Sequence, residues 1–200
     1  MKSFDLDVSN LPPVAFGPRT TVWWGVIGLL VIEGTMFALL IATYFYLRQN
    51  FQAWPPLGTP APDLAAGTAN MVLLLVSIWP MRLAHVAALK EEREPIWIWL
   101  TVCIAAGIIA LILRAFEFKA MHCKWDSHAY GSVVWTILGM HVIHLLASTI
   151  ENIIIAVLML RGPVERKHFV DTNVNALYWY FVVLVWLPVY AIIYFAPRVL

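Results

Sequence analysis

Two ionisable side chains, Glu33 and His141, lie deep inside long apolar segments of the sequence. Each lies eleven residues into its segment, which corresponds to about 17 Å at ~1.5 Å per helical residue. If both segments are helices that cross a membrane in opposite directions, the two side chains share a depth near its middle and can form a hydrogen bond. Burial disfavours the charged form of a carboxyl group, so we expect Glu33 to be protonated. Glu33 is then either a proton-active or lipid-contacting acid, or a neutral group that ties two helices together.

A second group of polar side chains follows His141 at helical spacing. His144, Ser148 and Glu151 continue a 3-4-3 pattern, so all four side chains share one face of a helix. Histidines beside a carboxylate suggest a metal, but a di-metal helical bundle carries Glu-x-x-His on two helices. That spacing occurs in the sequence at residues 165–168, in a charged segment that we expect to be a loop. We therefore predict a polar seam between helices and no metal site.

Arg114 and Glu117 complete the predicted seam. They are three residues apart, a spacing at which two side chains pair on one helix face. Their apolar segment ends soon afterwards, so we expect both near the membrane surface, where the long Arg114 side chain can reach water. The sequence contains no phosphate-binding loop, nucleophilic triad or carboxylate dyad. We therefore expect no catalytic residue in this chain.

The composition decides which elements must position these residues. Hydrophobic residues make up 62% of the 200 residues and charged residues 12%, against about 45–50% and 25% in soluble domains. The mean hydropathy is +0.78, and a net charge of +1 offers no basic field for a nucleic acid. This composition indicates an integral membrane protein.

Five apolar segments are long enough to cross a hydrocarbon core of about 30 Å as helices. They are residues 22–47, 69–89, 96–118, 130–160 and 174–196. The predicted fold is therefore all-α, an integral membrane bundle of five transmembrane helices. We expect a polar N-terminal tail over 1–20, without the apolar region of a signal peptide, and a single transmembrane domain over 21–198.

The connecting segments are polar or rich in proline. We expect loops at 51–68, 90–95, 119–128 and 162–172. Eight basic residues fall on the side of the N-terminus and five on the other side, which predicts an inside N-terminus and an outside C-terminus. Aromatic residues 178–180 lie near the start of the last predicted span and indicate an interfacial belt.

Several short motifs follow one another between residues 20 and 196. They are GLLVIEGTMFALLIATYFYLR around Glu33, Trp54-Pro55-Pro56, Asn70, Ala84-His85, Ala115-Phe116-Glu117-Phe118, Tyr130-Gly131-Ser132, Gly139-Met140-His141-Val142-Ile143-His144 and Ala176-Leu177-Tyr178-Trp179-Tyr180-Phe181-Val182. In this order they resemble subunit III of the haem–copper oxidases, in its shorter five-helix form. The chain departs from the family pattern at Ile32, Met36, Tyr180 and Val183.

The resemblance implies an accessory, non-redox subunit of a terminal oxidase in aerobic respiratory electron transport, a complex that reduces oxygen and translocates protons. A cytochrome c oxidase is the first expectation and a quinol oxidase the alternative. The partners implied are subunit I as the main contact, subunit II and other small subunits. Haem and copper are expected in those chains and none in this one. The implied location is the bacterial inner membrane.

The resemblance also assigns roles to particular residues. Glu33 is the intramembrane acid, which supports proton uptake and protects the core subunit during turnover. Glu33, His144 and Arg161 are expected to contact bound phospholipid, with His141 beside them.

Two other classes of function stay open from the residues alone. A membrane cytochrome would hold a b-type haem between paired histidines, and His85 opposite His141 or His144 is the candidate pair. A proton-coupled transporter would use Glu33 and work without partner chains.

Overall fold

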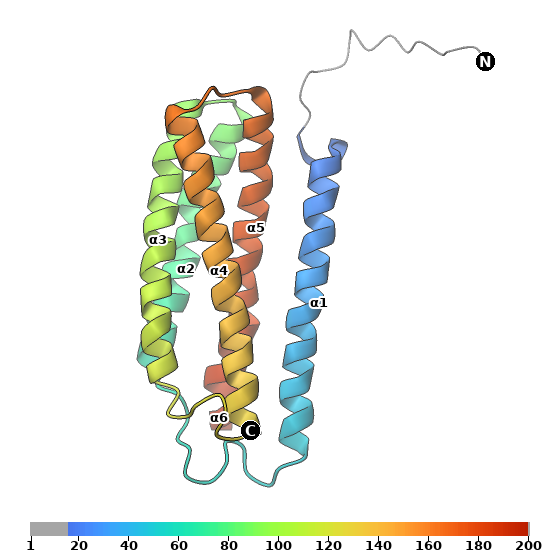
Figure 1. Cartoon of the computed structure of the whole chain (residues 1–200), viewed down its shortest axis with the longest axis vertical. Helices are drawn as coiled ribbons and strands as arrows, with labels where there is room; N and C mark the ends of the chain where they lie inside the picture. Colours follow the sequence, from blue (N-terminus) through green and yellow to red (C-terminus); the bar gives the residue numbers. More distant parts are fainter. Residues whose placement is uncertain (1–15, 200) are drawn as a thin grey trace, which may run out of the picture.

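The computed structural model describes residues 16–199, which form an all-helical membrane protein without strands in that part of the chain. Five long helices follow one another along the chain (Figure 1). They are α1 (Thr21–Gln49), α2 (Leu64–Leu89), α3 (Arg93–Lys119), α4 (Ala129–Arg161) and α5 (Arg166–Tyr190). A π-helical turn, Ala191–Phe195, continues α5 into the short α6 (Ala196–Val199), and a 3-10 turn, Gly17–Arg19, precedes α1. All five long helices are long and apolar enough to span a membrane, as predicted.

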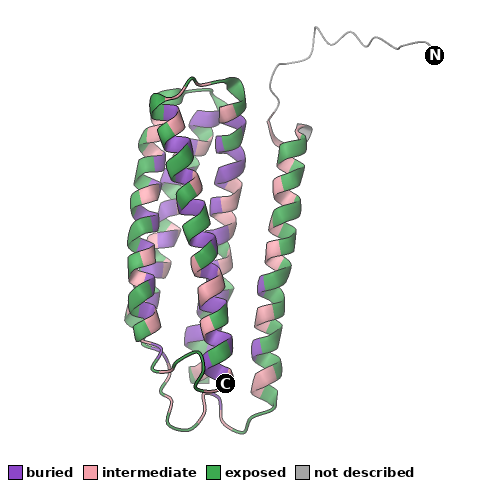
Figure 2. Cartoon of the chain, in the orientation of Figure 1, coloured by how far each residue is buried: buried purple, intermediate pink, exposed green. Residues whose placement is uncertain are grey.

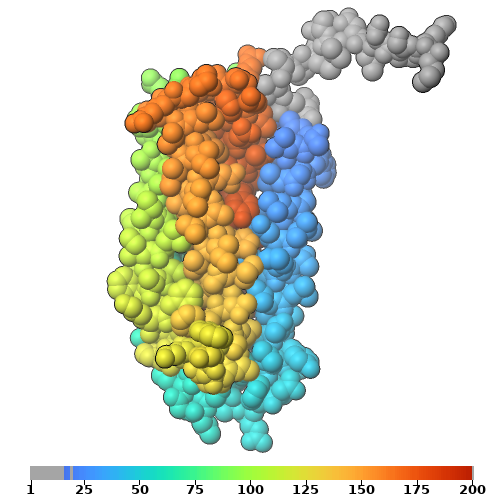
Figure 3. Space-filling model, viewed as in Figure 1, coloured from blue at the N-terminus to red at the C-terminus, as the bar shows by residue number. Residues whose placement is uncertain are grey.

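The helices run up and down, so neighbours in sequence lie antiparallel. α2, α3, α4 and α5 form a four-helix group, and α1 stands at its side against α4 and α5 (Figures 1 and 3). The α2–α3 and α4–α5 connections lie at the end where α1 begins, and the chain finishes at the opposite end (Figure 1).

Burial differs sharply between these two parts of the bundle. The four-helix group carries buried residues on its inward faces, whereas α1 is exposed along most of its length (Figure 2). Phe37 and Tyr44 are the buried residues of α1. Since a membrane surrounds such a bundle, the exposed apolar side chains of α1 face lipid or a neighbouring subunit.

The fifth helix begins at Arg166, eight residues before the predicted start at 174. The predicted loop 162–172 was therefore wrong beyond residue 165. Glu165 is the N-cap of α5. In a capping box, the Glu165 side chain accepts from the backbone N–H of His168, and the His168 side chain accepts from the backbone N–H of Glu165. The predicted Glu-x-x-His spacing in a loop is thus the signature of a helix start.

The earlier start also moves the aromatic residues 178–180 from the predicted interface into the body of the helix. Trp179 is fully buried, and its indole Nε1 donates a hydrogen bond to Ser77 Oγ at 3.0 Å. The prediction of an interfacial belt there was wrong, because Asn173 and Asn175 lowered the hydropathy of a helical turn that is in fact buried.

The other boundaries shift less. α2 starts at Leu64 where the prediction placed residue 69, and the turn predicted at 90–95 contracts to residues 90–92. Most of the predicted polar tail over 1–20 lies outside the described residues.

Candidate functional site

Two polar sites meet on α4, where His141 and His144 lie about one helical turn apart. His141 is fully buried and faces α3 and α5, whereas His144 faces α1. The predicted face of α4 thus exists, but it serves two different sites. We call the site around His141 the inner network and the site around His144 the α1 pair.

The inner network is built on Glu117, which is 0% exposed and accepts hydrogen bonds from three different helices or turns. Arg114 Nη1 lies 2.8 Å from Oε2 in a salt bridge. Asn70 Nδ2 on α2 donates to Oε1 at 2.6 Å, and the Tyr194 hydroxyl donates to Oε2 at 2.8 Å. The three donors satisfy both oxygens of a charge buried inside the bundle.

The position of Arg114 near the end of α3 had suggested that its side chain reaches water, but it does not. Its side chain is 1% exposed, and the guanidinium carbon lies 3.8 Å from the ring centroid of Trp186, in cation–π contact. Its Nη2 lies 3.0 Å from Nδ1 of His141. The i, i+3 pairing with Glu117 is as its spacing predicts, but the prediction of a surface position was wrong. Neighbouring helices cover this face of α3.

His141 uses both of its ring nitrogens within the inner network. Since a guanidinium can only donate, Nδ1 accepts from Arg114. Nε2 therefore carries the hydrogen and donates to the carbonyl of Val182 at 2.9 Å. His141 is a neutral imidazole that ties α4 to α3 and α5.

The π-helical turn and a glycine together admit Tyr194 to this network. Tyr194 lies within Ala191–Phe195 and is fully buried. A Cβ atom on Gly67 would lie 2.3 Å from Cζ of Tyr194. Glycine at this position of α2 therefore lets the phenol ring reach Glu117.

The α1 pair consists of Glu33 and His144. Glu33 Oε2 lies 3.5 Å from Nε2 of His144, and the Tyr178 hydroxyl lies 3.5 Å from Oε1. Both contacts are longer than an ordinary hydrogen bond. The prediction that Glu33 meets His141 was wrong: Phe37 packs against both histidine rings, and His144 is the one that faces Glu33.

The facing atoms of the α1 pair, Oε2 of Glu33 and Nε2 of His144, can hold a proton between them. The Met140 carbonyl can only accept, so Nδ1 of His144 carries a hydrogen and donates it at 2.6 Å. One further proton can sit on Glu33, which leaves two neutral groups, or on Nε2, which gives an ion pair. A carboxyl and an imidazole in this arrangement can exchange a proton with each other or with a neighbouring group.

The remaining predicted residues are not brought into either site. Ser148 is fully buried and its Oγ has no hydrogen-bond partner among the described residues, while Glu151 is half-buried. Arg161 lies seventeen residues after His144 on α4, about 25 Å away along the helix axis. It lines an apolar groove of ≈ 490 Å³ with Ile153 and Val157.

Three residues of these sites were not expected from the sequence to contribute. Asn70 and Tyr178 stood only in short motifs, Tyr178 also among interfacial aromatic residues, and Tyr194 was not singled out. A buried amide inside an apolar helix usually marks a helix–helix hydrogen bond, and that signal was available for Asn70. Among residues 16–199, no group of three or more histidine, cysteine, aspartate or glutamate side chains is arranged to hold a metal ion.

Comparison with known proteins adds an independent finding. Residues 15–197 match the model of the family described as "Cytochrome c oxidase subunit III". The chain is 26% identical over 199 residues to cytochrome c oxidase subunit 3 of Synechocystis sp., covering 96% of this chain and 84% of the relative. It is 24% identical to the protein of the same name from Thermostichus vulcanus, over 87% of both chains. The human cytochrome c oxidase subunit 3 is 27% identical, over 92% of this chain and 72% of the relative.

Proposed function

The chain belongs to the cytochrome c oxidase subunit III family, and we propose that it is the accessory, non-redox subunit of a cytochrome c oxidase in aerobic respiration. The observation that carries this proposal is the family match over residues 15–197, which includes all five membrane-spanning helices. The relatives described above are all named for cytochrome c oxidase, which favours that enzyme over a quinol oxidase. The partners proposed are subunit I as the main contact, subunit II and the smaller subunits.

We propose that the haem and copper of the complex are held by those partner chains. The support lies in how the buried histidines are already engaged. Both ring nitrogens of His141 form hydrogen bonds, and Nδ1 of His144 is bound to a backbone carbonyl. The chemistry of oxygen reduction then belongs to the core, and the residues of this chain position helices and protons beside it.

The alternative of a b-type haem between His85 and a histidine of α4 is disfavoured by the positions of their partners. His85 bonds to Asn173 and His141 bonds to Val182, nine residues further along α5. This separation is about 13 Å along the helix axis, whereas two axial ligands point at one iron atom. A haem absorption band in the isolated chain would contradict the proposal.

The α1 pair is the part of this chain that we propose supports proton uptake by the core. Glu33 and His144 face each other between α1, which is largely exposed, and the four-helix group. In addition, we propose that Glu33, His144 and Arg161 contact phospholipid. Arg161 takes part at the end of α4, in a separate groove from the other two.

We propose that the chain lies in the bacterial inner membrane with its N-terminus inside. The support is the excess of basic residues at the end where α1 begins, eight against five. A reporter that fluoresces only in the cytoplasm, fused after Leu200, is expected to stay dark. A bright fusion in the native membrane would overturn this orientation.

The function is tested by purifying the membrane complex through a tag on this chain in mild detergent. Subunits I and II are expected to co-purify, and the haem spectrum is expected to stay with them when this chain is dissociated. The complex without this chain should start at nearly normal oxygen consumption and then lose activity faster during sustained turnover. Recovery of the chain without any oxidase subunit would contradict the proposal.

A further inference from the structure

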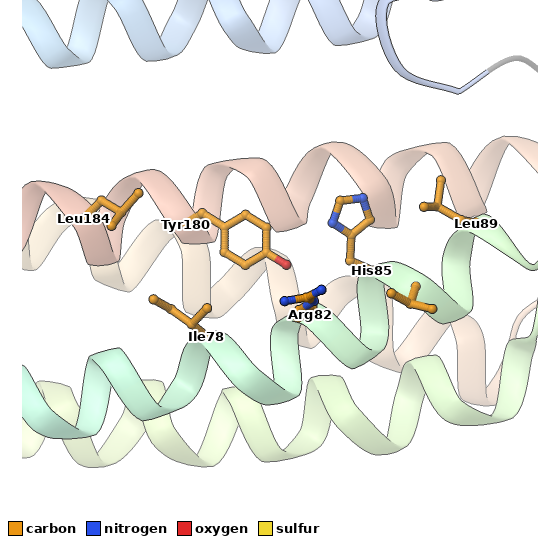
Figure 4. A pocket seen from close by; sticks show the side chains of 7 residues that line it. Ile78, Arg82, His85, Leu89, Tyr180 and Leu184 are labelled. Atoms are coloured by element: carbon orange, nitrogen blue, oxygen red, sulfur yellow. The ribbon is translucent and has the colours of Figure 1, made fainter.

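A groove between α2 and α5 carries a charged side chain that neither site above uses. The groove has a volume of ≈ 530 Å³ and is lined by Ile78, Arg82, His85, Val86, Leu89, Tyr180 and Leu184. Figure 4 shows Arg82 and His85 side by side on α2, with the Tyr180 side chain extending from α5 toward Arg82. The rest of the lining is aliphatic. The groove thus combines an apolar channel with one cationic and two polar groups.

Arg82 lies within the depth of the membrane. It precedes the last residue of α2 by seven positions, about 10 Å along the axis. α2 has 26 residues, so its length of about 39 Å exceeds a 30 Å hydrocarbon core by about 4–5 Å at each end. The Cα atom of Arg82 therefore lies roughly 6 Å inside the hydrocarbon region. At this depth the long Arg82 side chain can either extend to the membrane surface or pair with an anion in the groove.

Among the described residues, no carboxylate pairs with Arg82; the Tyr180 side chain is its polar neighbour. Arg82 is exposed and forms no hydrogen bond or ion pair there. Other basic side chains at this end of the bundle are already engaged: Arg93 bonds to the carbonyls of Met159 and Gly162, and Arg166 pairs with Glu91 at 3.1 Å. The positive charge of Arg82 therefore faces the surroundings of the bundle.

His85 offers a second donor directed by its own partner. The Asn173 amide Nδ2 donates to Nε2 of His85 at 2.7 Å, so the ring hydrogen sits on Nδ1. Among the described residues, Nδ1 has no hydrogen-bond partner. A guanidinium and an imidazole N–H on neighbouring turns match the oxygens of a phosphodiester, which accepts charge-assisted hydrogen bonds.

We propose that this groove binds one anionic phospholipid, whose phosphodiester pairs with Arg82 and His85 and whose acyl chain lies along Ile78 and Leu184. The apolar lining and the depth favour a lipid over a free phosphate ion. An anionic headgroup compensates the charge of Arg82, whereas a zwitterionic headgroup brings its own cation. The proposal does not depend on the oxidase assignment, because it uses only the groove and its depth in the membrane.

The test uses the membrane complex purified through this chain and reconstituted in nanodiscs. A phosphatidylglycerol with a photoreactive group in its acyl chain is activated, and labelled peptides are identified by mass spectrometry. Labelling is expected on the segments around Ile78 and Leu184. Arg82→Gln is expected to lower it about tenfold, the effect of losing a charge-assisted hydrogen bond. Leu184→Trp, which fills the groove and keeps the charge, should lower it as well.

Lys90→Gln is the matched control, because it removes one positive charge at the same end of α2 outside the groove. It is expected to label like the wild type. Equal labelling by a phosphatidylcholine probe would overturn the anionic headgroup. Labelling that is unaffected by both Arg82→Gln and Leu184→Trp, or crosslinks from the groove to another polypeptide in place of lipid, would overturn the site. None of these outcomes depends on oxygen consumption, so failure of this site is distinguishable from failure of the oxidase proposal.

Discussion

Glu117 and Glu33 are both carboxylic acids within membrane-spanning helices, but their surroundings differ. Glu117 is 0% exposed and receives three donors at 2.6–2.8 Å, whereas Glu33 is 15% exposed and has two contacts at 3.5 Å. The helices differ in the same way: 33–44% of the most apolar stretch of each helix in the four-helix group is buried, against 6% in α1.

The difference sets how costly a change of charge is at each acid. Moving a proton at Glu117 would leave Arg114 as a buried cation without its counter-charge, which is costly. At Glu33 the nearest partners, His144 and Tyr178, are both 3.5 Å away, so little hydrogen bonding is lost when its charge changes. We therefore regard the inner network as a structural contact between helices and the α1 pair as the site whose charge can change.

The largest effect expected from this comparison is that of Arg114→Met. The change leaves the charge of Glu117 buried without its cation, which typically costs about 3–5 kcal/mol. Thermal unfolding of the purified complex in mild detergent should show a large loss of stability, or the chain should fail to assemble.

The double variant Arg114→Met/Glu117→Gln is the control for this prediction. Glutamine removes the buried charge and keeps an oxygen that accepts from Asn70 or Tyr194. The double variant is expected to be more stable than Arg114→Met alone. A single variant with wild-type stability would show that the inner network does not hold the helices together.

Gly67→Ala should destabilise the bundle by about 1–3 kcal/mol, the usual cost of overpacking. The added Cβ would lie 2.3 Å from Cζ and 2.6 Å from the hydroxyl of Tyr194, so the ring must move away from Glu117. The matched variant is Gly28→Ala on α1, whose Cβ would meet nothing within 4 Å. There we expect a gain of up to about 1 kcal/mol from helix propensity. Effects of the same sign and size would remove the contrast between α1 and the four-helix group.

Glu33→Ala is expected to shorten the time for which the oxidase stays active during turnover more than it lowers the stability of the complex. Because Glu33 is partly exposed and its contacts are long, the complex should assemble with unchanged haem spectra and lose less than about 1 kcal/mol. Initial oxygen consumption should fall only slightly, while activity decays faster in long oxygen-uptake traces.

Glu33→Gln separates proton exchange from hydrogen bonding. Its amide can donate to His144 Nε2 and its carbonyl can accept from Tyr178, but it carries no titratable proton. If proton exchange is the role of Glu33, this variant decays like Glu33→Ala. Wild-type endurance of the glutamine variant alone would make Glu33 a structural hydrogen-bond partner, and wild-type endurance of both would remove it from the function.

The smallest effect is expected for Tyr178→Phe, which removes the 3.5 Å contact to Glu33. A double-mutant cycle with Glu33→Ala should give a coupling near 0.6 kcal/mol, the average for hydrogen bonds between membrane helices. A coupling well above about 1.7 kcal/mol, the largest such value, would place Glu33 in a site as tightly held as the inner network.

Hydropathy located the five spans and the order of the helices, because each apolar run exceeds the thickness of a membrane. It misplaced the start of α5, since Asn173 and Asn175 are polar residues that the neighbouring helices bury. The capping pair Glu165 and His168 was present in the sequence, but its meaning depends on whether a helix follows.

The sequence by itself determined that this chain is a five-helix membrane protein, that Glu33 and His141 lie deep within its helices, and which face of α4 carries His141 and His144. Helical periodicity and membrane thickness are local properties, so a linear sequence records them. Only the tertiary structure decided that His144 faces Glu33, that His141 faces Arg114 and that Asn70 and Tyr194 complete the inner network. Those pairings depend on the rotation and crossing of helices that lie far apart in the sequence, and no local spacing specifies either.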